Sequence, residues 1–230
     1  MTGYSRPIGH PAGIISSNGP LRLFGRRIML RPLVATDFEA WSEVRLRNGE
    51  WLTKWEPMPL ITSPDPAKSR DAFTNRCAAR DRERQAGNAY CMGLFINNVF
   101  AGEVNLNSVV RGAMQSGTIG YWIDEAKAGN SYMSEAVLVL SKFAFDELRL
   151  HRVEVCIIPR NAASHRVVEK LALRHEGIAE RFLEINGIWE DHVRYGFTIE
   201  EWQSRREELS ATWLVCAQLC VASTVLSSSA

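Results

Sequence analysis

Hydrophobic and polar residues follow two periods along the chain, and these periods separate the expected strands from the expected helices. Alternating apolar residues predict strands over 22–32, 90–96, 99–109, 118–124, 151–158, 177–185 and 189–197. Apolar residues near helical spacing predict helices over 36–46, 63–85, 132–148 and 162–173, a short helical piece at 51–55 and a last helix beginning at 200. This order predicts an α/β fold with a mixed, mostly antiparallel sheet.

One strand–turn–helix unit carries the strongest chemical signal. The strand over 119–124 leads through a turn that contains Gly129 into a helix starting near Tyr132, and a second strand follows from His151. The two strands are expected to be parallel, because a crossover helix joins them. Free backbone N–H groups and the helix dipole favour an anion at such a helix start, so the turn predicts a pyrophosphate site.

Composition narrows the class of protein. The chain has 230 residues, 46% of them hydrophobic, and a formal net charge of +1. That is enough for a full core, and the absence of a strong positive charge disfavours nucleic acid as a direct partner. Five cysteines without a short paired spacing indicate reduced thiols and a cytoplasmic location. No histidine spacing typical of a metal site occurs, so we expect no metal.

The ends of the chain are expected to lie outside the main domain. Residues 1–20 hold three prolines and no signal-peptide core, which predicts a flexible arm before a domain over 21–202. Residues 203–230 are left as a C-terminal helix or tail. Their apolar part is shorter than the ~20 residues of a membrane span, so we expect no membrane partner. A docked helix, an oligomer contact and a non-native or disordered extension remain open.

Several motifs together resemble the GNAT superfamily of N-acetyltransferases, in particular its RimJ/RimL branch, which acetylates ribosomal proteins. They include 128–136 (AGNSYMSEA), 150–154 (LHRVE) and 185–192 (INGIWEDH). The match to the family's acyl-CoA loop, Gln/Arg-x-x-Gly-x-Gly/Ala, is partial: Gly129 fits, but Ala126 and Ser131 do not. The resemblance implies a GNAT fold whose parallel strands open a V-shaped cleft for acetyl-CoA.

The resemblance also implies which residues bind acetyl-CoA. The strand backbone would hold the thioester oxygen and the pantetheine arm, the loop amides would bind the phosphates, and Lys127 would replace the missing arginine. The expected cofactor-binding residues are Tyr121, Trp122, Ile123, Lys127, Gly129, Asn130, Ser131, Tyr132, Met133 and Asn161. For Asn161, simple capping of the following helix is an equally physical interpretation.

Two residues are candidates for catalysis, and two for acceptor binding. Glu103 lies mid-strand beside a glycine and could act as a base through a water, although a solvated strand face explains it as well. Ser164 could assist departure of the thiolate, because the tyrosine that many relatives have later in this helix is absent. Trp51 and Trp55 could line a groove for the acceptor, or belong to the core.

The sequence therefore predicts an acetyl-CoA-dependent N-acetyltransferase, active as a monomer or homodimer. The resemblance implies the N-terminus of a ribosomal protein as the acceptor. An α-amine, whose pKa is about 7.7–8.0, also needs less help to lose its proton than a lysine at about 10.4. Two alternatives remain open: a small-molecule amine (an aminoglycoside, polyamine or amino acid) as acceptor, and a catalytically silent acyl-CoA-binding module.

Overall fold

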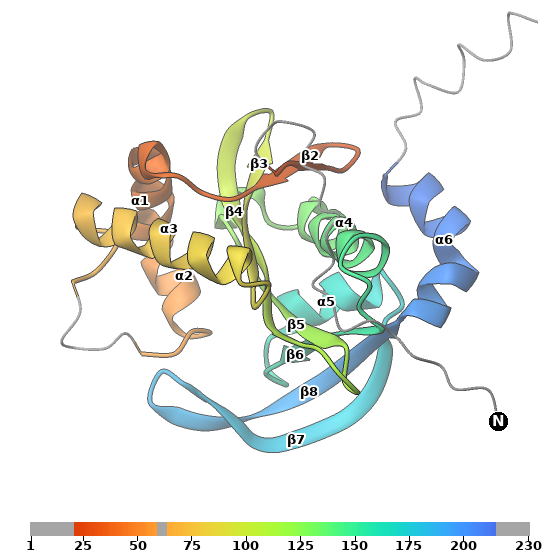
Figure 1. Ribbon diagram of the computed structural model, residues 1–230. Coiled ribbons are helices and arrows are strands. Elements are labelled where there is room, and N and C mark those ends of the chain that lie inside the picture. Colours follow the sequence, from red (N-terminus) through yellow and green to blue (C-terminus); the bar gives the residue numbers. More distant parts are fainter. Residues whose placement is uncertain (1–20, 59–63, 215–230) are drawn as a thin grey trace, which may run out of the picture.

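An eight-stranded sheet runs through the whole fold (Figure 1). The computed structural model describes residues 21–58 and 64–214. The sheet order is β1-β2-β3-β4-β5-β6-β8-β7. The strands are β1 (Leu23–Phe24), β2 (Ile28–Arg31), β3 (Tyr90–Ile96), β4 (Val99–Val110), β5 (Ser116–Ile123), β6 (Arg152–Ile157), β7 (Arg174–Ile185) and β8 (Ile188–Thr198). The helices are α1 (Phe38–Arg47), α2 (Gly49–Thr53), α3 (Arg70–Gln85), α4 (Tyr132–Asp146), α5 (Ala162–Glu169) and α6 (Ile199–Trp213), with 3-10 turns η1 (Ala35–Asp37) and η2 (Glu125–Lys127).

The prediction of a mixed, mostly antiparallel sheet is confirmed. All neighbouring strands are antiparallel except β5 and β6. This parallel pair is bonded only over 116–118 and 152–154, after which β5 continues to Ile123 beside β4 alone. The two strands therefore part, which leaves one backbone edge of residues 119–123 facing the gap between them.

Helices cover the sheet on both faces (Figure 1). Helix α4 contacts β1, β2, β4, β5 and β6 on one face, with α5 and α6 beside it, whereas α1 contacts β4 and α3 contacts β3 on the other. Each face has its own apolar cluster, one beneath α4 and a smaller one around the fully buried Phe73 of α3. The C-terminal helix expected after residue 200 is α6, whose Trp202 and Leu209 are buried in the first cluster.

Three elements differ from the expectation, each for a local reason. The strand predicted over 22–32 is a hairpin, because Gly25 N donates to Ile28 O at 3.0 Å and turns the chain between β1 and β2. Helix α3 begins at Arg70 rather than near residue 63, with the Ser69 hydroxyl accepting from Ala72 N. Helix α4 is buried on all sides from Met133 to Ser141, since the sheet, α5 and α6 surround it, so its apolar surface extends beyond one stripe.

Smaller differences occur at two other helix ends. A 3-10 turn, η1, precedes α1, and the Asp37 carboxylate accepts from Val34 N at 2.8 Å as it closes that turn. Helix α5 stops at Glu169, although its predicted range reached Leu173; Leu171 and Leu173 are buried in the core without being helical. The arm expected over 1–20 lies outside the described residues.

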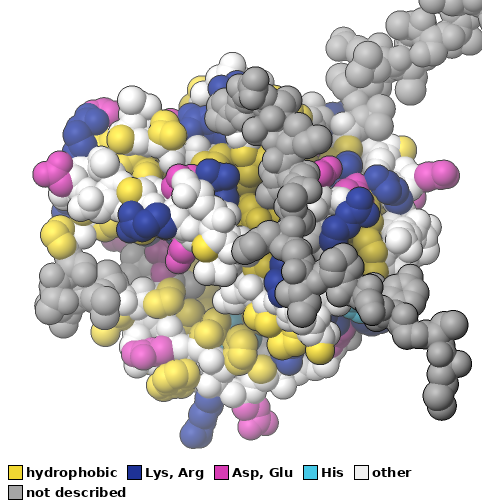
Figure 2. All heavy atoms as spheres, in the orientation of Figure 1, with side chains coloured by type: hydrophobic (Ala, Val, Ile, Leu, Met, Phe, Trp, Pro, Cys, Tyr) yellow, Lys and Arg dark blue, Asp and Glu magenta, His cyan; other side chains and the backbone are white. Residues whose placement is uncertain are grey.

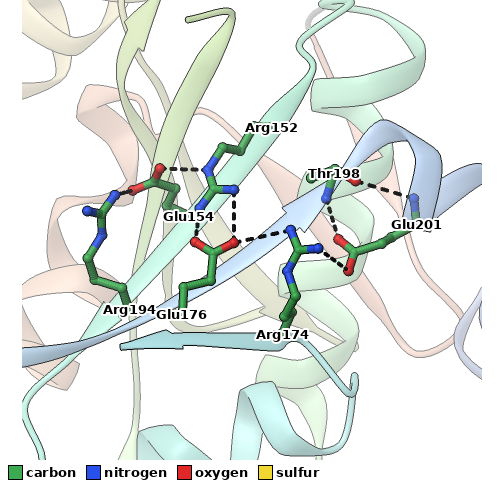
Figure 3. A network of polar contacts seen from close by, with 7 residues as sticks. All are labelled: Arg152, Glu154, Arg174, Glu176, Arg194, Thr198 and Glu201. Atoms are coloured by element: carbon green, nitrogen blue, oxygen red, sulfur yellow. Dashed lines mark hydrogen bonds and ion pairs between the residues drawn. The ribbon is translucent and has the colours of Figure 1, made fainter. Parts of the chain in front are cut away.

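A network of ion pairs fastens the last hairpin to β6 and to the start of α6 (Figure 3). Arg152 of β6 pairs with Glu154 of its own strand and with Glu176 of β7, and Arg194 of β8 also pairs with Glu154. Arg174 links Glu176 to Glu201, the residue that completes the capping box of α6 with Thr198. The hairpin itself turns at Asn186 and Gly187, both with positive φ, as predicted for this dipeptide.

Candidate active site

A cavity of about 210 Å³ opens where β5 and β6 part. Its lining comes from five places: α2 and the residues just after it, the end of β5, the loop leading into α4, the first turn of α4, and the segment of α5. The lining residues are Trp51, Leu52, Trp55, Glu56, Tyr121, Trp122, Ile123, Lys127, Ala128, Gly129, Ser131, Tyr132, Met133, Ser134, Asn161, Ala163, Ser164, Arg166, Val167 and Lys170. The structure thus brings together the candidate residues for cofactor, acceptor and thiolate, apart from Glu103 and Asn130.

The loop before α4 has the backbone shape of an anion site. Gly129 has φ +80° and Ser131 has φ +63°, so two left-handed residues precede the first turn of the helix. A Cβ at Gly129 would meet no heavy atom within 4 Å, which means that the backbone there is open on its outer side. Alternating backbone of this kind directs successive N–H groups toward one point. Asn130 shapes the loop instead of lining the cavity, since its amide donates to Lys127 O and Ala128 O.

The start of this loop is held by the end of α1. The buried Asp124 accepts hydrogen bonds from Asn48 Nδ2 at 2.9 Å and from the Arg47 guanidinium, and Asn48 Oδ1 accepts from Glu125 N at 2.9 Å. Burial by itself would raise the pKa of the Asp124 carboxyl, but the bonds from Arg47 and Asn48 outweigh it and lower that pKa. The loop therefore starts from a fixed, ionised anchor.

The far end of the loop before α4 is held by the β1–β2 hairpin. Arg27 donates to the buried Glu135 of α4 through both its backbone N and its Nε, at 2.6 and 2.8 Å. The same guanidinium donates to Asn130 O at 3.1 Å and lies 4.7 Å from the centre of the Tyr132 ring. Glu135 is thus engaged in holding the loop.

Helix α5 adds two cations that the sequence analysis did not select. Lys170 Nζ donates to Ser131 Oγ at 2.6 Å, and Arg166 lines the cavity one turn earlier in the chain. Together with Lys127, they make the loop side of the cavity basic. The sequence does hold a signal for these cations. Arg166 and Lys170 are four residues apart in the segment that follows the second parallel strand, and the crossover brings that segment beside the loop.

The phenol of Tyr121 reaches across the gap to the start of α5. Its hydroxyl donates to Ser164 O at 3.1 Å, and Ser164 N donates in turn to Asn161 Oδ1 at 3.1 Å. Asn161 therefore caps α5, which was the alternative interpretation of this residue, while it also lines the cavity. Burial raises the pKa of the Tyr121 hydroxyl, so this group stays protonated at neutral pH.

Glu103 lies elsewhere, on the face of the sheet covered by α1 and α3. It is 1% exposed and accepts from Trp41 Nε1 at 2.6 Å and from Arg76 Nη2 at 2.7 Å. It borders a separate small cavity with Arg76, Arg80 and Cys91, and it does not line the cavity between β5 and β6. Burial would raise the pKa of its carboxyl, but Arg76, Arg80 and Trp41 lower it. This placement favours a role in the fold.

The wall of the cavity where the sequence predicts acceptor binding is built from α2 and the residues after it. Trp51, Trp55 and Glu56 line it, and the turn of the β7–β8 hairpin closes on them, with Asn186 N donating to Glu56 O at 2.9 Å. Farther along that hairpin, Asp191 accepts from Arg181 N, and the buried His192 contacts Glu190 O through Nδ1.

Two further features of the described residues bear on chemistry. Over 21–58 and 64–214, no group of His, Cys, Asp and Glu side chains is arranged to hold a metal ion. Within the same residues, no helix has the length and hydrophobicity needed to cross a membrane.

The comparisons with known proteins identify the family. The model of the acetyltransferase (GNAT) domain matches residues 27–174. The chain therefore belongs to the GNAT acetyltransferase family and is an acetyl-CoA-dependent N-acetyltransferase, and RimJ-type enzymes are among the proteins that it resembles.

Individual relatives cover most of the chain. It is 36% identical over 172 residues to the probable N-acetyltransferase YjcK of Bacillus subtilis. The aligned residues make up 74% of this chain and 93% of that protein. It is 28% identical to the [ribosomal protein uS5]-alanine N-acetyltransferase of Escherichia coli, over 83% of this chain and 97% of that protein. The structure of Mycobacterium smegmatis RimJ in complex with CoA-disulfide superposes with a TM-score of 0.78 at 29% identity, covering 86% and 98% of the two chains.

The cavity fits the co-substrate that the family uses. Acetyl-CoA carries a pyrophosphate, an amide-rich arm and a thioester. The open backbone at Gly129, the basic side chains of Lys127 and Lys170, and the free edge of β5 offer matching groups. Each feature is made by this chain without the arginine of the family motif.

Proposed function

We propose that this enzyme transfers the acetyl group of acetyl-CoA to the N-terminal α-amine of a protein, by direct attack in a ternary complex. One observation carries the proposal: a single cavity joins the anion-binding loop, the free edge of β5 and an aromatic acceptor wall. Both substrates could therefore meet without a covalent enzyme intermediate.

The residues of the cavity would divide the work. Backbone N–H groups from Gly129 to Met133 and the side chains of Lys127 and Lys170 would hold the phosphates. The free edge of Tyr121–Ile123 would bind the pantetheine amides and the thioester oxygen. Ser164 would lie beside the leaving sulfur, with the protonated Tyr121 hydroxyl next to it.

A polypeptide acceptor is supported by the surface beside the cavity. The hairpin that closes on Glu56 exposes Ile188 and Trp189, by 64% and 60%. Figure 2 shows hydrophobic side chains at the surface in the region of this hairpin. Exposed apolar surface next to a site is typical of macromolecular recognition. Two relatives have names that refer to the ribosome, the [ribosomal protein uS5]-alanine N-acetyltransferase of Escherichia coli and the putative ribosomal N-acetyltransferase YdaF of Bacillus subtilis. These names support a ribosomal protein as the acceptor.

Deprotonation of the amine would need little help from the protein. An α-amine has a pKa of about 7.7–8.0, so a useful fraction is neutral at physiological pH. We assign Glu103 to the support of α1 and α3, and solvent in the open cavity accepts the proton in this scheme.

The experiment is to incubate the enzyme with acetyl-CoA and a panel of N-terminal peptides of ribosomal proteins, and to follow the mass of each product. A gain of one acetyl group at the α-amine is expected for at least one peptide. Peptides that are blocked at the N-terminus but keep a lysine serve as the matched control. Acetylation confined to aminoglycosides, polyamines or free amino acids would replace the protein acceptor by a small amine.

The second alternative, a catalytically silent acyl-CoA-binding module, predicts a different result in the same assay. It would bind CoA without acetylating any amine in the panel. The partial loop motif and the missing tyrosine motivate this alternative, whereas the Tyr121–Ser164 contact in the cavity argues against it.

A further inference from the structure

The charged side chains that line the cavity differ between its two sides. Lys127, Arg166 and Lys170 come from the loop and from α5, and all three are basic. Over the described ranges, Glu56 is the only acidic side chain in the lining, and it lies in the wall that also holds Trp51 and Trp55. A cavity that is basic on one side and acidic on the other suits a ligand pair consisting of a polyanion and a cation.

Glu56 is held in place from behind. Its two carboxylate oxygens accept from Arg45 Nη1 and Nη2, both at 2.7 Å, and the Arg45 guanidinium lies 5.0 Å from the centre of the Trp122 ring. Burial would lower the pKa of Arg45, but the bond with Glu56 raises it, so Arg45 remains charged. A carboxylate has about four acceptor positions, and a bidentate arginine uses two of them. The others remain accessible, because the side chain of Glu56 is 31% exposed.

The neighbouring aromatic rings are already in contact with cations. Lys54 Nζ lies 5.3 Å from the centre of the Trp55 ring, and Arg160 Cζ lies 4.9 Å from it. Arg160 is itself paired with Glu190 of β8. An incoming ammonium group therefore finds its counter-charge at Glu56, while the rings enclose the residue that carries the amine.

We propose that Glu56, positioned by Arg45, binds the protonated amine of the acceptor and selects cationic acceptors over uncharged ones. The proposal rests on the proposed function only in that an amine is acetylated in this cavity. At pH 7 most of an α-amine is protonated, so the ion pair with Glu56 forms when the acceptor binds. The amine then loses its proton to solvent in the open cavity before it attacks the thioester. The binding step and the deprotonation step thereby become separate.

The test compares two unreactive analogues of a peptide that the enzyme accepts. One carries an N,N-dimethylated terminus, which is cationic, and the other lacks the amine and is neutral. With the native enzyme we expect the cationic analogue to inhibit about 10-fold more strongly. Glu56→Gln should make the two analogues nearly equal and raise the KM of the peptide, while the Kd of CoA stays unchanged. A merely structural Glu56 would not alter the preference for charge.

Two variants control the test. Glu50→Gln removes an exposed carboxylate from α2, six residues before Glu56 in the chain, and it should keep the native preference. Glu56→Asp keeps the charge and should keep the preference for the cationic analogue. If Glu56→Gln does not fold, Glu56→Asp takes its place, and a folded Glu56→Asp without this preference contradicts the proposal. An unchanged preference in Glu56→Gln overturns it.

The outcome is separable from that of the proposed function. If the enzyme acetylates only a small amine, the protein acceptor is wrong, and the same pair of analogues is made from that amine. Loss of the charge preference in Glu56→Gln then still supports Glu56 as the amine site, and its retention still refutes it.

Discussion

Lys170 adds a second cation to the loop side of the cavity, beside Lys127. The family motif has Gln or Arg where this chain has Ala126, and Lys170 reaches the loop from α5 to contact Ser131. A cation delivered by another helix serves the same electrostatic purpose as one within the loop, although without the two-pronged geometry of arginine.

Replacement of Lys170 by alanine is expected to weaken CoA binding about fivefold. The loss of one exposed cation near a phosphate corresponds to ~1 kcal/mol, and the effect should shrink at high salt. Calorimetric titration of CoA measures it. Lys142→Ala is the control, since that lysine pairs with Asp146 at the far end of α4 and should leave the affinity unchanged. An equal effect of both variants would contradict the role of Lys170.

Glu103 provides a second prediction for a single residue. Glu103→Gln removes the charge that faces Arg76 and Arg80 in a buried position, so the free energy of unfolding should fall by about 3 kcal/mol. Urea denaturation measures the loss. The pH profile of kcat/KM for the folded variant should match that of the native enzyme. A stable variant that has lost the acid limb of this profile would instead restore Glu103 as the base.

At the scale of elements, the packing of the β7–β8 hairpin against β6 depends on charge. Glu154 and Glu176 share Arg152, and Arg194 and Arg174 extend the network on either side (Figure 3). For Glu154, burial would raise the carboxyl pKa, but Arg152 and Arg194 lower it. For Glu176, the hydrogen bond with Arg152 is the main cause of a lowered pKa. Both groups thus bind protons less readily in the folded state.

This difference predicts that acid weakens the hairpin. Because the folded pKa values lie below the unfolded value of about 4.3, the unfolded chain takes up more protons as the pH falls, and the stabilisation present at neutral pH is lost below about pH 5. Glu154→Gln should flatten part of this pH dependence and cost about 1 kcal/mol or less at pH 7. Thermal unfolding between pH 3 and pH 7 measures it, with Glu180→Gln, an exposed carboxylate of β7, as the control. Identical pH curves for the native protein and Glu154→Gln would contradict this account.

At the scale of the whole molecule, CoA should stabilise the fold. The cavity collects residues from α2, β5, the loop, α4 and α5, so ligand binding links both faces of the sheet. At 100 times the Kd, CoA should add about 2.7 kcal/mol, or roughly 5–10 °C in Tm for a domain of this size. Differential scanning fluorimetry measures the shift. Pantetheine, which lacks the pyrophosphate and the nucleotide of CoA, serves as the control and should raise Tm less. Equal increases in Tm would contradict a phosphate site at the loop.

Local sequence patterns predicted most elements and one half of the cavity. Alternation located β3, β4, β6 and the β7–β8 hairpin, and Asn186-Gly187 specified its turn, since these signals lie within a few residues of each other. Gly129 and the helix start after it predicted the anion-binding loop for the same reason. Backbone geometry of this kind depends on neighbours in the chain.

The remaining features arose from contacts between distant segments. Lys170 meets Ser131 across 39 residues, and Arg27 meets Glu135 across 108. Glu103 could face either side of the sheet in a strand viewed alone, and α1 with α3 placed Arg76 and Trp41 on its side. Alternation along a strand predicts that the sheet has two faces, but only tertiary packing decides which helices cover each face. The sequence by itself therefore determined the fold class and the backbone shape of the loop at Gly129, whereas the tertiary structure decided which charged groups line the cavity, because electrostatic contacts form between whichever side chains the fold brings together.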